Sequence, residues 1–268
     1  MYKDMNIQKD RRCVFSIEEL PFLADHQLEG TPFVPMAVII DELARTFSRD
    51  CCCFADIEIK MPVMLRRKRA KSVVCASDES SASLLDEAEN LHASLKKSAN
   101  IVSESGFMLA APRAAMPVAV VKHQIYPALM FHGPTFQADF VFYEFNRQTV
   151  LVELSDFGRD SSKLGRYASD QRIPIILFDL LLQTAGLHLM AFSDTYGLPA
   201  ACASLSVFAG NHTGNVLVRT TCHAGEVYNI LASDLSGKPL LACSGLRFAT
   251  SSRRIETEKK DLLEKLIK

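Results

Sequence analysis

Asp179 is a carboxylate in one of the most hydrophobic parts of the chain. The surrounding stretch 173–192 consists almost entirely of apolar residues, so this acidic side chain is expected to be buried. Removing an ionised carboxylate from water costs several kcal/mol unless a partner is supplied, and a buried acid therefore tends to keep its proton. A carboxyl group that is protonated near neutral pH is suited to general acid catalysis.

His26 is the candidate base that could work with this acid. It stands in the pattern His26-x3-Gly30-x4-Pro35, where x is any residue, just before a predicted helix. Imidazole is a natural base at neutral pH, and glycine lets a backbone approach a ligand closely. Free N–H groups at a helix start can also polarise a carbonyl. A loop histidine beside a helix start is by itself more often a cap or an exposed residue. This motif alone therefore does not indicate a catalytic histidine, and a second motif is needed to support that interpretation.

Gln183 is the second polar group that is predicted to share a site with Asp179. The two residues are four positions apart, which places them on the same face of a helix. The amide could orient the acid or hydrogen-bond a ligand, and a satisfied buried polar pair is the alternative interpretation. His188 is nine positions after Asp179, about half a turn out of phase, and is not expected in the site.

Two long apolar helices are expected to position these groups. One follows Pro35 and covers about 36–47, and the other follows Pro174 and carries Asp179. Each helix falls in a half-chain made mainly of strands, and a proline-bearing stretch, 112–117, lies between the halves. Strands are predicted at 54–63, 72–75, 91–95, 106–111, 138–144, 149–154, 202–208, 214–222, 226–234 and 239–248. The same architecture, one helix with an antiparallel sheet, is therefore expected twice.

Two segments are predicted to lie outside this plan. The stretch 77–89 is rich in Ser, Asp and Glu, which is typical of a surface excursion. The stretch 253–268 has five apolar residues among many charged ones, which is typical of an amphipathic helix or a linker.

The composition excludes several classes of protein. The chain has 268 residues, of which 48% are hydrophobic, and a formal net charge of -1, so it has enough apolar residues for one large domain or two small ones. Nucleic acid is not an expected partner, because phosphate binding needs a broad cationic surface. The stretch 173–192 is long enough to span a bilayer, but Asp179, Gln183 and His188 inside it favour a core helix, so no membrane segment is expected.

The cysteines and loops give no sign of a metal or a cofactor. Eight cysteines include no Cys-x-x-Cys pair, and the consecutive run 51–53 suits neither a zinc site nor a disulfide framework. No glycine-rich phosphate loop is present. The first ten residues contain no apolar signal core. We expect reduced thiols, a cytoplasmic location, no metal and no cofactor of the protein's own.

The two motifs together resemble the dehydratase domains of polyketide synthases and related fatty-acid synthases. His26-x3-Gly30-x4-Pro35 comes first and Asp179-x3-Gln183 second, as in that family. Further similar elements are Phe131-His-Gly-Pro-Thr-Phe-Gln137, Leu198-Pro199 and the closing stretch 233–248. The resemblance covers about 14–250. One departure is His132, where many members carry a tyrosine before the Gly-Pro pair.

The resemblance implies an α+β double hot-dog fold, with two antiparallel sheets each wrapped around a central helix. The first half would be 10–112 with His26 and the second 118–250 with Asp179, followed by a charged amphipathic tail, 251–268. The implied partners are an acyl carrier protein, which holds the substrate on its phosphopantetheine, and neighbouring synthase domains. An apolar strand edge in each half also allows a homodimer.

The implied reaction is dehydration of a 3-hydroxyacyl thioester to a trans-2-enoyl thioester. His26 would take the proton from C2, and Asp179 would donate to the departing hydroxyl. The residues expected to bind or orient the substrate are Gly30, Pro35, His132, Gly133, Pro134 and Gln183. The loop position of His26 predicts an exposed imidazole. A related cyclase or isomerase, and a non-catalytic module that binds a carrier-held chain, remain alternatives.

Overall fold

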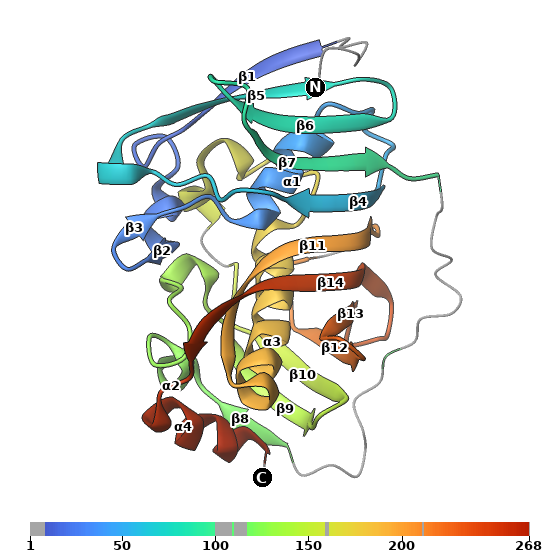
Figure 1. The fold of residues 1–268 in the computed structure, drawn as a ribbon. Helices are drawn as coiled ribbons and strands as arrows, with labels where there is room; N and C mark the ends of the chain where they lie inside the picture. Colours follow the sequence, from blue (N-terminus) through green and yellow to red (C-terminus); the bar gives the residue numbers. More distant parts are fainter. Residues whose placement is uncertain (1–8, 100–108, 110–116, 159–160, 211, 268) are drawn as a thin grey trace.

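The computed structural model describes residues 9–99, 109, 117–158, 161–210 and 212–267. Its main feature is one antiparallel sheet of twelve strands, in the order β1-β5-β6-β7-β4-β11-β14-β13-β12-β10-β9-β8 (Figure 1). The first five strands in this order come from the N-terminal half of the chain and the other seven from the C-terminal half. The architecture is therefore α+β, as the sequence predicts.

In the N-terminal half, one helix packs against a curved five-stranded part of the sheet. The strands are β1 (Lys9–Phe15), β4 (Cys53–Ile59), β5 (Lys71–Ser77), β6 (Ser81–Asp86) and β7 (Leu91–Lys97). The helix α1 (Met36–Ala44) contacts β6 and β7, and all nine of its residues are buried. Seven of its nine residues are apolar, and the two acids, Asp41 and Glu42, are buried with them, so α1 is stable only as the covered core of this half.

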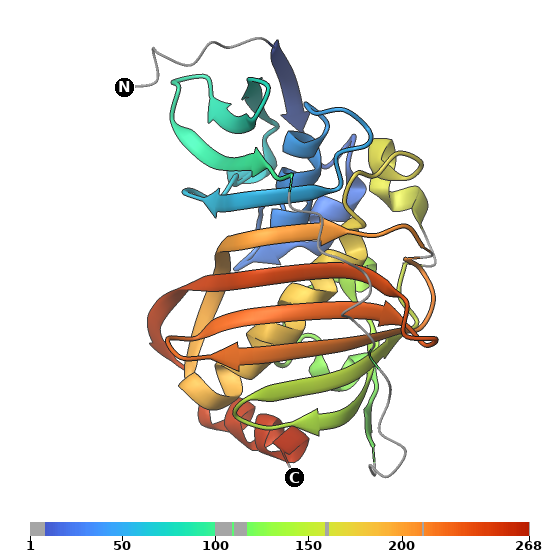
Figure 2. The ribbon, with the colours of Figure 1, turned by 90° about the vertical axis from the view of Figure 1, so that its right-hand side faces the viewer.

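The C-terminal half repeats this plan on a larger scale. Its strands are β8 (Val118–Val120), β9 (Asp139–Phe145), β10 (Thr149–Ser155), β11 (Thr195–Val207), β12 (Val216–His223), β13 (Val227–Asp234) and β14 (Pro239–Arg254). The helix α3 (Ile175–Ser193) contacts β10 to β13 on the concave side of this sheet, which Figure 2 shows from its convex side.

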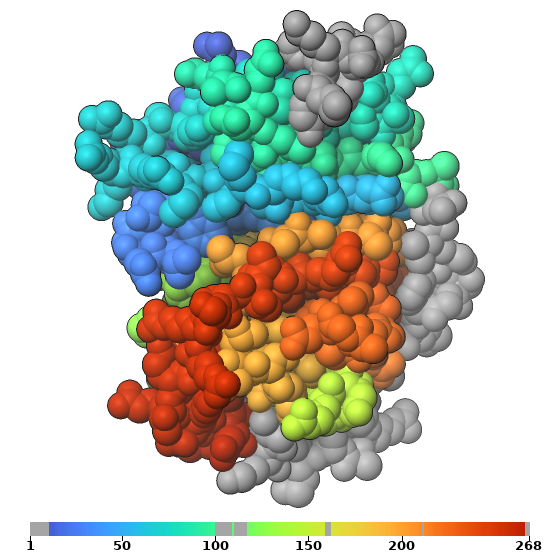
Figure 3. All heavy atoms as spheres, in the orientation of Figure 1, coloured from blue at the N-terminus to red at the C-terminus, as the bar shows by residue number. Residues whose placement is uncertain are grey.

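The two halves are joined along β4 and β11. These strands are hydrogen-bonded, with Ile57 opposite Cys202 and Phe54 opposite Leu205. The two separate sheets expected from the sequence are thus one continuous sheet, because strands at the inner edges of the halves pair with each other. The space-filling view in Figure 3 shows the halves stacked directly along this line.

The helix α3 meets the length and composition criteria for a membrane span, and its mean hydropathy is 1.8 over the most apolar window. In the structure 83% of that window is buried inside the protein. Its apolar residues pack against the sheet and against α1, as in the core helix that the sequence predicts.

Two differences from the expected elements concern the N-terminal half. The polar stretch 77–89 is not a surface excursion, because β6 runs through it with Ala82, Ser83 and Leu84 buried. The strand β1 was not anticipated; it pairs with β5 and buries Cys13 and Phe15. In β1 the exposed residues Arg11 and Arg12 hide the buried face, and in β6 the polar serines conceal a run of three consecutive buried residues. The predicted strand 106–111 lies mostly outside the described residues.

Short elements connect the sheet to the cavity described below. They are the 3-10 turns η1 (Pro21–Asp25), η2 (Arg66–Lys68), η4 (Pro134–Phe136) and η5 (Ser161–Tyr167), the hairpin of β2 (Gln27–Leu28) and β3 (Thr31–Pro32), and α2 (Lys122–Ile125). The chain ends in α4 (Thr257–Ile267), which contacts α3 and β9. The turn η1 buries Phe22 and Leu23 and contacts η4 and η5, so it holds the N-terminal motif close to the C-terminal half.

Candidate active site

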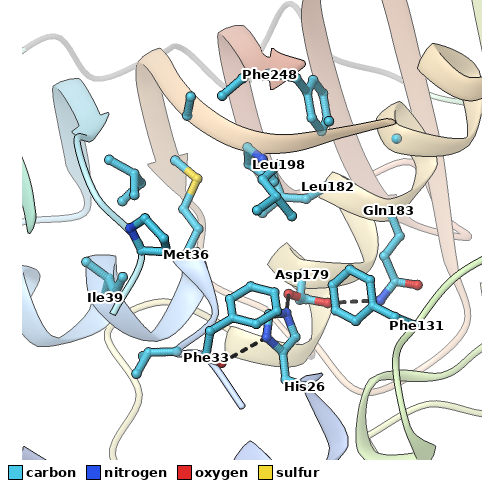
Figure 4. A pocket seen from close by; sticks show the side chains of 18 of the residues that line it. His26, Phe33, Met36, Ile39, Phe131, Asp179, Leu182, Gln183, Leu198 and Phe248 are labelled. Carbon is cyan, nitrogen blue, oxygen red and sulfur yellow. Dashed lines mark hydrogen bonds and ion pairs between the residues drawn. The ribbon is translucent and has the colours of Figure 1, made fainter. Parts of the chain in front are cut away.

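A cavity of about 190 Å³ lies where the two halves meet. Its wall is formed by residues of α1, α3, β4, β11 and β14 and of the loops around His26 and Phe131 (Figure 4). Most of the wall is apolar and consists of Phe33, Val34, Met36, Ile39, Ile59, Pro62, Met130, Phe131, Leu182, Leu198, Pro199 and Phe248. Four polar side chains, those of His26, His132, Asp179 and Gln183, meet at one place, and Lys60 is the other polar residue of the wall as far as the structure describes it.

One face of α3 supplies part of the wall. Asp179, Leu182, Gln183 and Gly186 all line the cavity, and they follow the spacing of one helical face. At Gly186 a Cβ would make only an ordinary van der Waals contact with the end of the Met130 side chain, at 3.6 Å. The predicted sharing of one face by Asp179 and Gln183 is confirmed by this geometry.

His26 lies between η1 and the β2–β3 hairpin, where the backbone fixes its ring. Its Nδ1 lies 3.0 Å from the carbonyl oxygen of Phe33, and its own carbonyl accepts a hydrogen bond from the Phe33 N–H at 3.1 Å. A carbonyl can only accept, so Nδ1 carries the proton and Nε2 keeps its lone pair. Nε2 faces Asp179 Oδ1 at 3.7 Å (Figure 4).

The His26 side chain is buried rather than exposed, contrary to the expectation from its loop position. Only 4% of the residue is accessible, because Phe33, Phe131 and Phe136 surround its ring. Burial lowers the pKa of His26 to about 3, against the opposing effect of its hydrogen bond to the Phe33 carbonyl. The imidazole is therefore neutral, which is the form that can accept a proton.

Asp179 is 3% accessible, and its burial raises its pKa to about 7. The hydrogen bond from Gln183 Nε2 to Oδ2, at 2.9 Å, opposes this effect only in part. Although His26 and Asp179 are close enough for an ion pair, below pH 7 both are neutral, a base with a free lone pair beside an acid with its proton.

Gln183 is held by three hydrogen bonds that fix which way its amide points. Nε2 donates to Asp179 and to the carbonyl oxygen of Phe136, both at 2.9 Å, and Oε1 accepts from the Tyr126 hydroxyl at 2.5 Å. Both amide hydrogens and the oxygen are thus satisfied without solvent. The side chain can orient Asp179, as expected, but its donors are not free to bind another group.

His132 lies beside the acid and next to His26, with the centroids of the two imidazole rings 5.2 Å apart. Its Nε2 is 3.4 Å from Asp179 Oδ2, and its ring stacks on Phe131 with the centroids 4.1 Å apart. Burial, with a smaller effect of His26, lowers its pKa well below the ordinary value. Three titratable groups therefore share one buried cluster.

Four of the predicted substrate-binding residues are not among those that line the cavity: Gly30, Pro35, Gly133 and Pro134. Gly30 has a φ of +76° and makes the turn between β2 and β3, and Pro35 is the N-cap of α1. Gly133 donates its N–H to the Asp25 carbonyl at 2.6 Å, and Pro134 begins η4. These residues shape the loops that carry His26 and His132.

Other functional neighbours were missed from the sequence. Tyr126 positions Gln183, and Asp25 accepts hydrogen bonds from the Thr135 N–H and hydroxyl at 3.1 and 2.5 Å. The only sequence signal for Asp25 is that it stands next to His26, and Tyr126 has none. Phe178, the residue before Asp179, is fully buried in the core and does not line the cavity.

His188 lies away from the cavity, as its helical phase predicts. Its Nε2 is 3.0 Å from the carbonyl oxygen of Asn146, and its ring packs against Phe192 and Tyr228. It is a buried structural histidine.

The comparisons with known proteins rest on structure alone. No family model and no curated protein matches the sequence. Solved structures do match over nearly the whole chain. The dehydratase domain from the CurF module of the curacin polyketide synthase has a TM-score of 0.72 and 17% identity, and the match covers 92% of this chain and 95% of that one.

Two more solved structures match this chain to a similar extent. The GphF dehydratase 1 has a TM-score of 0.71 and 14% identity over 89% of this chain and 92% of that chain. A bifunctional dehydratase-cyclase domain in ambruticin biosynthesis has a TM-score of 0.68 and 16% identity over 91% and 92%. At such identities the likeness speaks for the backbone rather than for the reaction. The chain has the hot-dog fold of the dehydratase domains of polyketide synthases.

Proposed function

We propose that the chain dehydrates a 3-hydroxyacyl thioester, held on the phosphopantetheine of an acyl carrier protein, to a trans-2-enoyl thioester. The observation that carries the proposal is the 3.7 Å approach of His26 Nε2 to Asp179 Oδ1 at the polar end of an apolar cavity. A neutral base and a protonated acid side by side are what removal of water from adjacent carbons requires. The likeness in fold to polyketide synthase dehydratase domains supports it.

The roles of the two residues follow from their protonation. His26 Nε2 takes the proton from C2, which the thioester carbonyl acidifies. The electron pair of that C–H bond becomes the C2–C3 double bond, and the C3–O bond breaks. Asp179 gives its proton to the departing hydroxyl, which leaves as water. The proton then passes from His26 back to Asp179 across the short distance between them, which restores the resting state.

The surrounding residues would assist without reacting. Gln183 holds Asp179 in place, and the Phe33 carbonyl holds the His26 ring. The apolar wall accommodates an acyl chain and excludes water, so a neutral acid is maintained. We further propose that the protein needs no cofactor of its own, works beside synthase domains in the cytoplasm, as a monomer or a homodimer, and acts in polyketide or fatty-acid-type biosynthesis.

The decisive experiment uses a 3-hydroxyacyl-pantetheine thioester and measures loss of one water by mass spectrometry. His26→Ala and Asp179→Asn should each lower the rate by roughly 10²-fold or more, the usual contribution of general acid–base catalysis. His223→Ala is the control, because His223 is exposed on β12, outside the cavity wall. Water loss that persists unchanged in both site variants would refute the proposed mechanism.

A cyclase is the second candidate, favoured by the match to the bifunctional dehydratase-cyclase domain. Proton transfer by His26 and Asp179 could also serve ring closure on the new double bond, or its isomerisation. NMR spectroscopy of the product separates these outcomes, since a ring lacks the two olefinic protons of a 2-enoyl thioester. A module that only binds the carrier-held chain would return the substrate unchanged.

A further inference from the structure

The cluster of His26, His132 and Asp179 also has the composition of a metal site. One ligand atom from each of these buried residues can be chosen so that all three lie within 4.8 Å of one another. Two imidazoles and one carboxylate, with an open position toward a cavity, are a donor set used by catalytic zinc and non-haem iron sites. The sequence predicts no metal here, because the three residues lie far apart along the chain.

The distances fit one small ion. Zinc binds imidazole nitrogen and carboxylate oxygen at about 2.0–2.2 Å, so neighbouring ligand atoms in a tetrahedral site lie about 3.4 Å apart. His132 Nε2 is 3.4 Å from Asp179 Oδ2, and His26 Nε2 is 3.7 Å from Oδ1. The two distances are to different oxygens of Asp179, so the side chains must rotate to bring all three ligands onto one ion, and the cavity beside them has room for water as a fourth ligand.

The surroundings favour a cation. Nδ1 of His26 is held by the Phe33 carbonyl, the kind of outer contact that orients a ligating histidine and directs Nε2 inward. Lys60 is the one cationic side chain among the described residues of the wall, and its ammonium pairs with Glu58. His132 Nδ1 is buried without a hydrogen-bond partner in the described part of the chain, and this unpaired N–H is the one feature of the cluster that opposes binding through Nε2.

A second trio in the same protein shows the contrast. Cys13, Cys75 and Glu42 also gather within 4.8 Å of one another, with the two sulfur atoms 3.6 Å apart. There Glu42 is already paired with Arg11 and Arg166, so two positive charges occupy the place of a cation. Within the described part of the chain, no arginine or lysine is paired with Asp179.

We infer that His26, His132 and Asp179 form a binding site for a divalent transition-metal ion of the zinc type, and that the bound ion blocks dehydration. The ion binds Nε2 of both histidines and the carboxylate, and the Asp179 proton is released to solvent. The His26 lone pair and the Asp179 proton, which the proposed reaction needs, are then both occupied. The inference rests on the residues of the proposed function, but the binding itself requires no turnover.

Cobalt(II) is the probe, because its visible absorption reports the ligands. Chelator-treated protein is titrated with Co²⁺ alone, and we expect one ion per chain with ligand-field bands and no thiolate-to-cobalt charge-transfer band. His26→Ala and His132→Phe should weaken binding at least about 100-fold. Cys13→Ser should leave it unchanged, because Cys13 belongs to the other trio. Should His132→Phe fail to fold, His132→Gln replaces it.

Activity is measured separately on the same preparations. Zn²⁺ should abolish water loss from the pantetheine thioester, and added chelator should restore it. Absence of stoichiometric Co²⁺ binding, a sulfur band, or binding that survives the loss of either histidine would overturn the inference. Turnover by metal-free protein without Co²⁺ binding leaves only the proposed function standing, and Co²⁺ binding without turnover leaves only the metal site.

Discussion

At the residue scale, the central feature is that burial makes Asp179 a weak acid and His26 a weak base. Neither change needs a special partner, since desolvation is the first cause of both pKa shifts. Each group is thus kept neutral by the same apolar wall that would accept an acyl chain. The chemistry and the packing of this site therefore have one physical origin.

This origin sets the expected pH dependence of the rate. With a pKa of about 7, Asp179 loses its proton as the pH rises through neutrality, and an ionised carboxylate cannot protonate the leaving hydroxyl. His26, with its pKa of about 3, stays a free base throughout. Turnover of chelator-treated protein should be level between pH 5 and about 6 and fall above about 7. A rate that instead rises from pH 6 to 8 would contradict this assignment.

Stability should respond to the same proton. The pKa of Asp179 is about 7 in the folded protein against 3.8 in the unfolded one, so its contribution is fully present below about pH 4. That contribution is lost as the pH rises to about 7. The asparagine of the Asp179→Asn variant cannot ionise. In denaturant unfolding at pH 8 the free energy of unfolding of this variant should exceed that of the wild type by roughly 4 kcal/mol, and the difference should disappear near pH 4. Equal differences at both pH values would argue against a buried, protonated Asp179.

At the scale of elements, the site depends on how closely the loop before η4 approaches the end of η1. Gly133 lies at this contact, and a Cβ there would be 2.9 Å from the Asp25 Cα, a backbone atom that cannot move aside easily. Both neighbours of the contact carry site residues, since His26 follows Asp25 and His132 precedes Gly133. The need for glycine here is one of space, because its φ of -81° is open to any residue.

Gly133→Ala should therefore separate η1 from η4 and disturb both histidines. We expect a loss of about 1–3 kcal/mol in the free energy of unfolding, as for other overpacked sites, together with a lower rate of dehydration. Thermal or denaturant unfolding measures the first effect. Gly214→Ala is the matched control, because a Cβ there meets nothing within 4 Å. Equal stabilities of the two variants would show that the loop before η4 can move to accommodate the added methyl group.

At the scale of the whole molecule, the halves are connected by more than the β4–β11 pair. Asp41 of α1 is fully buried and accepts hydrogen bonds from the backbone N–H groups of Arg172 and Ile173, at 2.5 and 2.9 Å. These residues lie just before α3, so a side chain of the first half fixes the start of the helix that carries Asp179. Arg45 Nε also donates to Asp41, at 2.6 Å.

Asp41→Ala should weaken this connection, because it leaves two backbone donors without an acceptor. The free energy of unfolding should fall by about 3–5 kcal/mol, which is the usual result of removing one partner of a buried charged pair. Asp170→Ala is the control, since the half-exposed Asp170 carboxylate pairs with Arg45 and Arg49 near the surface and should cost about 1 kcal/mol at most. Denaturant unfolding compares them, and similar losses would mean that Asp41 does not couple the halves.

The sequence by itself determined what depends on neighbours along the chain. The apolar helix around Asp179, the face that Asp179 shares with Gln183 and the different phase of His188 all follow from helical geometry. The same local periodicity located most of the strands, but it failed for β6, where three of the six residues are Ser or Asp and the buried residues Ala82, Ser83 and Leu84 are consecutive rather than alternate.

Only the tertiary structure decided which distant groups meet. The burial of His26, the position of His132 beside Asp179, the hydroxyl of Tyr126 on Gln183 and the single sheet arise from contacts between remote segments. A residue's neighbours along the chain fix its direction on a helix or a strand, because the covalent geometry is the same everywhere. Its accessibility and its pKa depend on the residues that pack over it. That packing is established only when both halves of the chain have folded together.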